Sequence, residues 1–172
     1  MKDAYTIEEV EAEVQKWHAR IVRLLPPVLG PRPHGRRRTK LYSLGDDIEV
    51  RFTGTRPRRK IAHGGQRGVC FNFWYMRAVP RDVYHHTVVH EVCHTIACRI
   101  EPCESHGTLW EFIMRIAGYQ PSRTANYSQF SPRAEQQDET SRRMWKLYQL
   151  RQKLAKLEEV ERVAAETLPD DE

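Results

Sequence analysis

The sequence has 172 residues and a formal net charge of +5, and 40% of its residues are hydrophobic while 30% are charged. This length fits one domain with an appendage, and no apolar run approaches the roughly 20 residues that a membrane-spanning helix needs. Because the acidic start lacks the apolar stretch of a secretion signal, we expect an intracellular protein of the cytoplasm, nucleoid or nucleus, with its four cysteines reduced and mostly buried.

The first predicted element is an amphipathic helix that begins after Thr6 and ends before Pro26. Thr6 followed by Glu9 is the pattern of a capping box at its start. Apolar residues then recur at spacings of three and four, as on one buried face of a helix. These residues are Ile7, Val10, Val14, Trp17, Ile21 and Leu24. Residues 30–40 lack this periodicity and predict an exposed basic loop.

Positive charge is concentrated between Arg20 and Lys60. That segment contains 12 Lys or Arg and 3 Asp or Glu, a local net charge of +9. The asymmetry favours a polyanionic partner such as nucleic acid, and the alternative is a charged surface that serves only solubility. The residues that we expect to bind nucleic acid are Arg36, Arg37, Arg38, Lys40, Arg58, Arg59 and Lys60.

Three short runs that are typical of β-strands follow, at residues 47–54, 58–65 and 68–76. Apolar residues alternate in the first run. The third run is rich in aromatic residues and is bounded by Gly68 and Pro80. Short strands at this spacing predict a small antiparallel sheet.

The next predicted helix runs from Pro80 to about Arg99 and contains His90, Glu91 and His94 in the order H-E-x-x-H. Residues four apart on a helix share one face and differ by about 6 Å in rise, so two imidazoles can converge on one ion. A catalytic zinc has three protein ligands and one open position. A glutamate beside it can take a proton from water and deliver it to a leaving amine. Five matching residues alone are weak evidence, because the pattern also arises by accident on surface helices.

Two residues are candidates for the third ligand. His106 ends the turn after the motif, and Glu111 lies inside a further apolar helix predicted at residues 108–118. His86 is excluded, because its Cα atom would lie about 12 Å along the helix axis from that of His94. The metzincin pattern is excluded too, because its glycine and third histidine are missing from their positions. The residues by themselves leave both candidates open.

From Pro132 the composition changes, and we expect a domain of residues 1–131 followed by a charged C-terminal helix and acidic tail, residues 132–172. The helix is basic from Arg142 to Lys156 and mostly acidic beyond. Its apolar residues form a heptad seam, interrupted at one position by Glu161. The seam residues are Leu147, Leu150, Leu154, Leu157, Ala164 and Leu168. This helix either packs on its own chain or binds a partner, which is another protein or a second copy in a homodimer.

Residues 90–118 resemble the SprT-like metalloproteases, the family that includes Spartan. That family combines H-E-x-x-H, a variable turn and H-G-x-x-[FW], which leads into an apolar helix with a methionine. The residues of this chain at the later positions are His106, Gly107, Trp110 and Met114. The similarity extends upstream through a strand, turn and strand ending at Asn72, and downstream through "PSRTANY". It covers roughly Thr6 to Tyr127.

The resemblance implies an α+β, zincin-like fold and a zinc-dependent metalloprotease. It assigns His90, His94 and His106 as ligands of Zn²⁺ and Glu91 as the catalytic acid and base. It also implies protein substrates that are bound or crosslinked to DNA, and hence a role in DNA–protein crosslink repair. Such substrates bind as extended strands at a sheet edge, which the resemblance places near residues 68–76.

Two alternatives stay open beside this function. One is a regulatory protease that cuts a specific protein without DNA. The other is a zinc-stabilised nucleic-acid-binding adaptor without turnover, against which Glu91 argues because a structural site has no use for an acid and base. Many SprT-like proteins also carry a cysteine-rich zinc ribbon after the protease core. This sequence has no cysteine after Cys103, so we expect no ribbon.

Overall fold

The computed structural model describes residues 4–26, 43–54, 61–101, 106–122, 130 and 136–167. The chain divides into two compact units, residues 1–132 and 133–172. None of the described helices has a stretch that is long and apolar enough to cross a membrane. The predicted basic loop and all seven of the predicted nucleic-acid-binding residues lie outside the described residues.

Helix α1 spans Ile7–Leu24 and begins with the predicted capping box. The backbone N–H of Glu9 donates to Thr6 Oγ1 at 3.2 Å, and the backbone N–H of Thr6 donates to Glu9 Oε2 at 2.8 Å. The apolar face is buried as predicted, except that Leu24 is 50% exposed. His18 is buried instead, on the same face as Ile21.

The sheet consists of β1 (Glu49–Thr53), β2 (Ala62–Gly65) and β3 (Gly68–Asn72), in the order β1-β3-β2. Strands β2 and β3 are antiparallel, whereas β1 and β3 are parallel. The prediction of an antiparallel sheet is therefore wrong for β1, and the sheet is mixed. The strands do alternate in direction along the chain, but β3 lies between the other two and so pairs in parallel with β1.

Helix α2 spans Phe73–Ala78 and corrects the prediction of one strand over residues 68–76. The strand ends at Asn72, whose side-chain oxygen accepts hydrogen bonds from the N–H groups of Trp74 at 3.0 Å and Tyr75 at 3.2 Å. Asparagine is a preferred N-cap, so a local side-chain contact overrides the strand propensity of the aromatic run.

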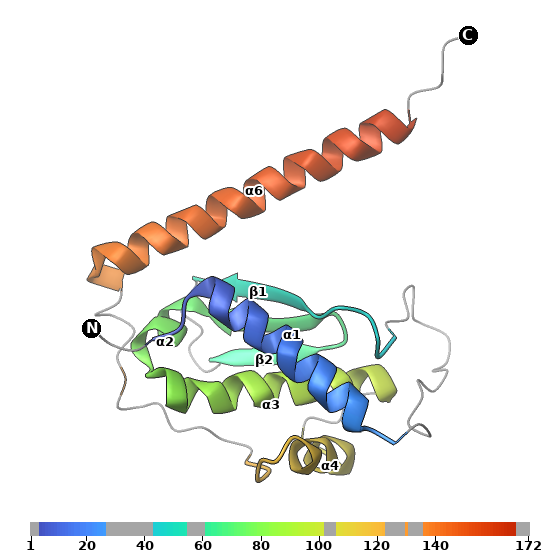
Figure 1. The fold of residues 1–172 in the computed structure, drawn as a ribbon. Helices are drawn as coiled ribbons and strands as arrows, with labels where there is room; N and C mark the ends of the chain where they lie inside the picture. Colours follow the sequence, from blue (N-terminus) through green and yellow to red (C-terminus); the bar gives the residue numbers. More distant parts are fainter. Residues whose placement is uncertain are drawn as a thin grey trace. The chain divides into compact units, whose positions relative to one another are not determined.

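Helix α3 spans Arg81–Ile100 and lies at the centre of the first unit, where it packs on α1, β2, β3 and α4 (Figure 1). Most of its second half is buried. Helix α4 spans Thr108–Ile116, and its buried residues are Trp110, Ile113 and Met114. In the second unit, α6 spans Glu139–Thr167, which confirms the prediction of an extended C-terminal helix.

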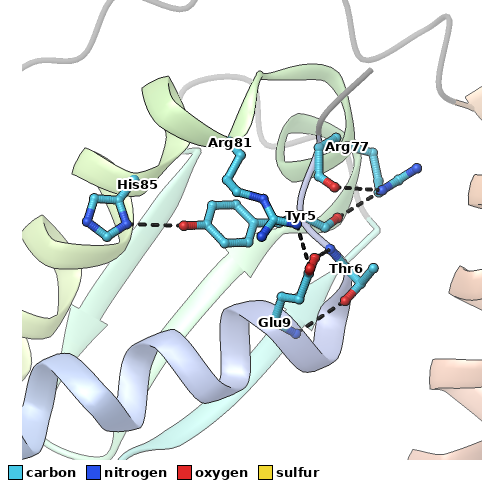
Figure 2. A network of polar contacts seen from close by, with 7 residues as sticks. Tyr5, Thr6, Glu9, Arg77, Arg81 and His85 are labelled. Atoms are coloured by element: carbon cyan, nitrogen blue, oxygen red, sulfur yellow. Dashed lines mark hydrogen bonds and ion pairs between the residues drawn. The ribbon is translucent and has the colours of Figure 1, made fainter. Parts of the chain in front are cut away.

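A polar network attaches the start of α1 to α2 and α3 (Figure 2). Arg81 Nη2 donates to Glu9 Oε1 at 2.5 Å, and Arg77 Nη1 donates to the carbonyl of Tyr5 at 2.9 Å. The Tyr5 hydroxyl lies 3.1 Å from His85 Nδ1. Burial, assisted by nearby carboxylates, raises the pKa of Tyr5 to about 12, so the phenol stays protonated. These contacts fix the first turn of α3 against α1.

The cysteines differ from the prediction of reduced thiols. Cys70 and Cys93 are free, but Cys98 in the last turns of α3 is disulfide-bonded. A disulfide depends on the distance and orientation of two cysteines in the fold, which their spacing in the sequence does not show. Burial raises the pKa of the Cys93 thiol, with a smaller contribution from Glu91.

Candidate metal centre

Three histidines from two segments converge on one point in the first unit. His90 and His94 project from one face of α3, and His106 comes from the turn before α4. The Nε2 atom of His90 lies 3.2 Å from that of His94 and 3.2 Å from that of His106. All three ligand atoms lie within 4.8 Å of one another. These are the three histidines that the family resemblance assigned as zinc ligands.

The spacing of these nitrogens fits a metal ion. Two nitrogens that bind one zinc at about 2.0–2.1 Å and at the tetrahedral angle are about 3.3 Å apart, which is close to the 3.2 Å found here. Three imidazoles cannot satisfy one another at this point, because a single Nε2 proton serves only one acceptor. A cation satisfies all three lone pairs at once.

The electrostatics also prepare the site for a cation. Burial, followed by the charges of the neighbouring His94 and His106, lowers the pKa of His90 to about 3. Burial, followed by the charge of His106, lowers the pKa of His94 to about 4. Both imidazoles are therefore neutral at pH 7, and a neutral imidazole is the form that binds metal. A hydrogen bond between His90 and the backbone of Ser122 acts in the opposite direction and helps to orient the ring.

The backbone at His106 has an unusual conformation. Its φ is +63°, and no other non-glycine residue among those described has a positive φ. Left-handed backbone is uncommon outside glycine, and such residues cluster at functional sites where the surrounding structure maintains them. Here the conformation turns the chain immediately before Gly107, the N-cap of α4, and allows the imidazole to reach the face of α3.

Trp110 contacts all three imidazoles from α4. Its ring is stacked on His94, with 5.1 Å between centroids and 20° between planes. It lies edge to face with His90 at 4.8 Å and with His106 at 4.6 Å. Its Nε1 donates a long hydrogen bond of 3.4 Å to the carbonyl of His90. Since Trp110 is only 1% exposed, it forms a rigid apolar wall beside the histidines.

Strand β2 approaches α3 closely beside the histidines. A Cβ atom on Gly64 would lie 2.8 Å from His94 Cβ and would overlap the carbonyl oxygen of Glu91. Glycine is therefore required at this position, as is common where a strand meets another backbone. Glu91 itself is buried, at 7% exposure, on the turn of α3 between the two histidines.

The two residues weighed against His106 lie elsewhere. Glu111 forms an ion pair with Arg115 at 3.5 Å on the surface of α4, and the metal-ligating cluster of the described residues does not include it. His86 has its ring centroid 6.3 Å from that of His90 and 5.5 Å from that of Tyr119. It is outside the cluster, as its position on the helix predicted.

Sequence reasoning missed two parts of this site. Trp110 was recognised only as a member of a family pattern, and its contact with every imidazole depends on how α4 packs on α3. Gly64 was not singled out, although a glycine inside a strand is a signal of close backbone approach. The predicted nucleic-acid-binding residues cannot be placed relative to this site, because they lie outside the described residues.

Comparison with known proteins agrees with this geometry. A sequence model described as the SprT-like family matches residues 38–132, just over half of the chain. The match contains β1 to β3, α2 to α4 and all three histidines. No curated protein and no solved structure matches the chain.

Proposed function

This chain belongs to the SprT-like family, and we propose that it is a zinc-dependent metalloprotease. Family membership points to a metalloprotease-like function. The observation that carries the proposal is the convergence of the Nε2 atoms of His90, His94 and His106 next to Glu91, in the segment that the family shares.

Three imidazoles are a donor set that catalytic zinc uses, with its fourth position left for water or substrate. When bound, zinc supplies a Lewis acid that polarises a scissile carbonyl and makes water more acidic. The chain itself holds the donors in place. Two imidazoles are fixed by the rigid spacing of α3, and Trp110 limits the movement of all three rings.

Glu91 is the residue that we assign to proton transfer. It follows the first ligand directly and lies on the same helix, so its position relative to His90 and His94 does not depend on a loop. In the proposed reaction its carboxylate accepts a proton from the attacking water and later donates that proton to the leaving amine. Because the carboxylate is mostly excluded from solvent, bulk water does not compete for this role.

The substrate is a protein segment in extended form. Strand β2 is at one edge of the described sheet and packs directly beside α3. An added strand on that edge would pass close to the histidines by main-chain hydrogen bonding. The family resemblance placed residues 68–76 near the substrate-binding edge, but β3 is the central strand, which makes β2 the better candidate.

We further propose that the substrates are proteins associated with DNA or crosslinked to it. The support is the net charge of +9 between Arg20 and Lys60, because lysines and arginines that neutralise phosphates bind DNA in a sequence-independent way. Such binding would bring the protease to proteins on DNA. A regulatory protease that acts without DNA, and an adaptor without turnover, are the competing functions.

One experiment separates these functions. The zinc-loaded full-length protein is incubated with histone, as a test substrate, in the presence and absence of DNA. We expect cleavage that DNA stimulates, and a loss of at least about 10²-fold in the Glu91→Gln variant with zinc content unchanged. Equal cleavage without DNA would favour the regulatory protease. Undiminished cleavage by Glu91→Gln would remove this residue from the mechanism, and no cleavage by the wild type would favour the adaptor.

A further inference from the structure

In the second unit, helix α6 presents an exposed apolar face. Every residue from Gln149 to Glu166 is exposed, and so is Leu147. Six exposed residues of α6 are large and apolar. These are Leu147 (51%), Leu150 (51%), Leu154 (58%), Leu157 (61%), Val160 (64%) and Val163 (45%). A single helix with this much exposed apolar surface is marginal in water, because most helical stability comes from packing.

The spacing of the leucines defines what the face can pack against. Leu147, Leu150, Leu154 and Leu157 alternate in steps of three and four, and the same steps continue to Glu161 and Ala164. This is the seam of a coiled coil, in which the partner is another helix with matching apolar positions. Six seam positions correspond to about two and a half heptads, enough to align a second helix but not to bind it irreversibly.

The charges beside the seam favour a partner whose charge pattern is reversed. Residues 142–156 of α6 contain six Lys or Arg and no Asp or Glu, whereas residues 157–167 contain four Glu and one Arg. That arginine, Arg162, is ion-paired within the helix to Glu159 and Glu166, each at 2.8 Å. By helical spacing these three residues lie away from the seam. The charges that flank the seam itself include Lys146, Arg151, Lys153 and Glu158.

We propose that α6 pairs with α6 of a second copy of this chain in antiparallel orientation. Such a pair, centred between Leu154 and Leu157, places Leu154 of each copy opposite Leu157 of the other. The basic half of each helix then lies along the acidic half of the other. Arg151 of each copy comes beside Glu158 of the other, which gives two equivalent opposite-charge contacts across the seam.

A parallel pair of the same helices is less favourable. It would place Glu161 against Glu161 at a seam position, so that two like charges are removed from water together. It would also place Lys146 of each copy beside Arg151 of the other, while the one opposite-charge contact it offers beside the seam is that of Lys153 with Glu158. In the antiparallel pair, Glu161 lies opposite Leu150 near the end of the seam instead, where its carboxylate can reach solvent.

Sedimentation of the zinc-loaded full-length protein over a range of concentrations tests the pairing. We expect a monomer–dimer equilibrium. The double variant that carries both Leu154→Glu and Leu157→Glu, at two seam positions, should raise the dimer Kd by at least about 10-fold. The matched control is Gln149→Glu with Gln152→Glu, which adds the same two charges away from the seam and should leave the Kd within about 3-fold. A wild type that is monomeric throughout, whether its seam packs on its own chain or on another protein, would overturn the proposal. So would a dimer that the seam variant does not weaken.

A charge reversal tests the orientation, because the two arrangements predict opposite signs. Arg151→Glu places like charges beside Glu158 in the antiparallel pair and should raise the Kd by about 3-fold or more. In the parallel pair it would relieve the contact with Lys146 and lower the Kd. Combining Arg151→Glu with Glu158→Arg should restore the wild-type Kd. Tighter association of the Arg151→Glu variant would overturn the antiparallel arrangement.

Discussion

The indole of Trp110 is stacked on the imidazole of His94, with ring centroids 5.1 Å apart and planes 20° apart. The two residues come from different helices, so this contact ties the position of α4 to the candidate metal centre. Trp110 also donates to the carbonyl of His90 and touches the ring of His106. A side chain that contacts every ligand fixes their orientation before any ion arrives, which reduces the entropy lost on binding.

The first prediction follows from this contact. Trp110→Phe keeps an apolar ring but loses the Nε1–H donor, and it should weaken zinc binding by about 10-fold, measured by competition with a chelator. Trp110→Ala should weaken it more and should cost about 3–5 kcal/mol of stability through the cavity that it leaves. Phe112→Ala is the matched control, because Phe112 lies on the same helix and is 40% exposed. A Trp110→Phe variant with unchanged zinc affinity and unchanged cobalt absorption spectrum would show that Trp110 does not position the ligands.

The identity of the third ligand gives the second prediction. His106→Ala should remove one of three donors and reduce bound zinc well below about one ion per chain. Glu111→Ala should leave zinc content unchanged, because Glu111 is ion-paired with Arg115 on the surface. Metal analysis of the two purified variants decides between them. The reverse result, with zinc lost only in Glu111→Ala, would contradict the assignment of His106.

Two adjacent glycines of β2 supply a third prediction with an internal control. Gly64→Ala introduces a Cβ atom that overlaps the carbonyl of Glu91 and lies 2.8 Å from His94 Cβ, whereas a Cβ atom at Gly65 meets nothing within 4 Å. Gly64→Ala should therefore destabilise the protein by about 1–3 kcal/mol and weaken zinc binding, because α3 must move. Gly65→Ala should have little effect. Chemical denaturation and zinc titration measure both, and similar results for the two variants would contradict the close approach of β2.

The sequence predicted what local patterns determine. The capping box of Thr6 and Glu9, the buried stripe of α1 and the pairing of His90 with His94 each depend on residues three or four apart, and each is found. Contacts between distant segments were not predictable in this way. The parallel pairing of β1 with β3 arises because β3 lies between β1 and β2. The periodicity within a strand does not indicate the order of strands in a sheet.

The same distinction explains the smaller errors. Leu24 fits the apolar stripe of α1, but it lies in the last turn of the helix and is half exposed. His18 does not fit the stripe, yet it is buried, and it interacts with the backbone of Leu44 and with the charge of Arg99. Arg99 in turn is held by backbone carbonyls, including those of Asp46 at 2.5 Å and Asp47 at 2.9 Å. Burial of a charged residue of this kind depends on loop carbonyls that a sequence pattern does not reveal.

His18 gives the last prediction, which concerns pH. The imidazole is 5% exposed, and its Nε2 has no hydrogen-bond partner among the described residues. Burial lowers its pKa below 6.5, and the positive charge of Arg99 lowers it further, while a bond to the backbone of Leu44 and the charge of Asp47 oppose this. At a pH between the two pKa values, His18 is therefore protonated in the unfolded chain but neutral in the folded chain. The contribution of the neutral His18 to the free energy of unfolding is fully present above about pH 6.5. It falls as the pH drops toward the lowered pKa of His18 in the folded state.

Denaturation of the wild type and of His18→Gln across pH 8 to pH 5 measures this linkage. Glutamine stays neutral, so the variant should lose less stability on acidification, with a difference in slope of at most about 1.4 kcal/mol per pH unit. The other histidines titrate in both proteins, and their contribution cancels in the comparison. Since the pKa of His18 is lowered rather than raised, the two proteins should differ in the slope of stability against pH below about pH 6.5. Above that pH the two slopes should agree. Parallel stability curves over the whole range would mean that the folded protein accommodates a charged imidazole beside Arg99, and that the cluster of His18, Leu44 and Arg99 opens at low cost.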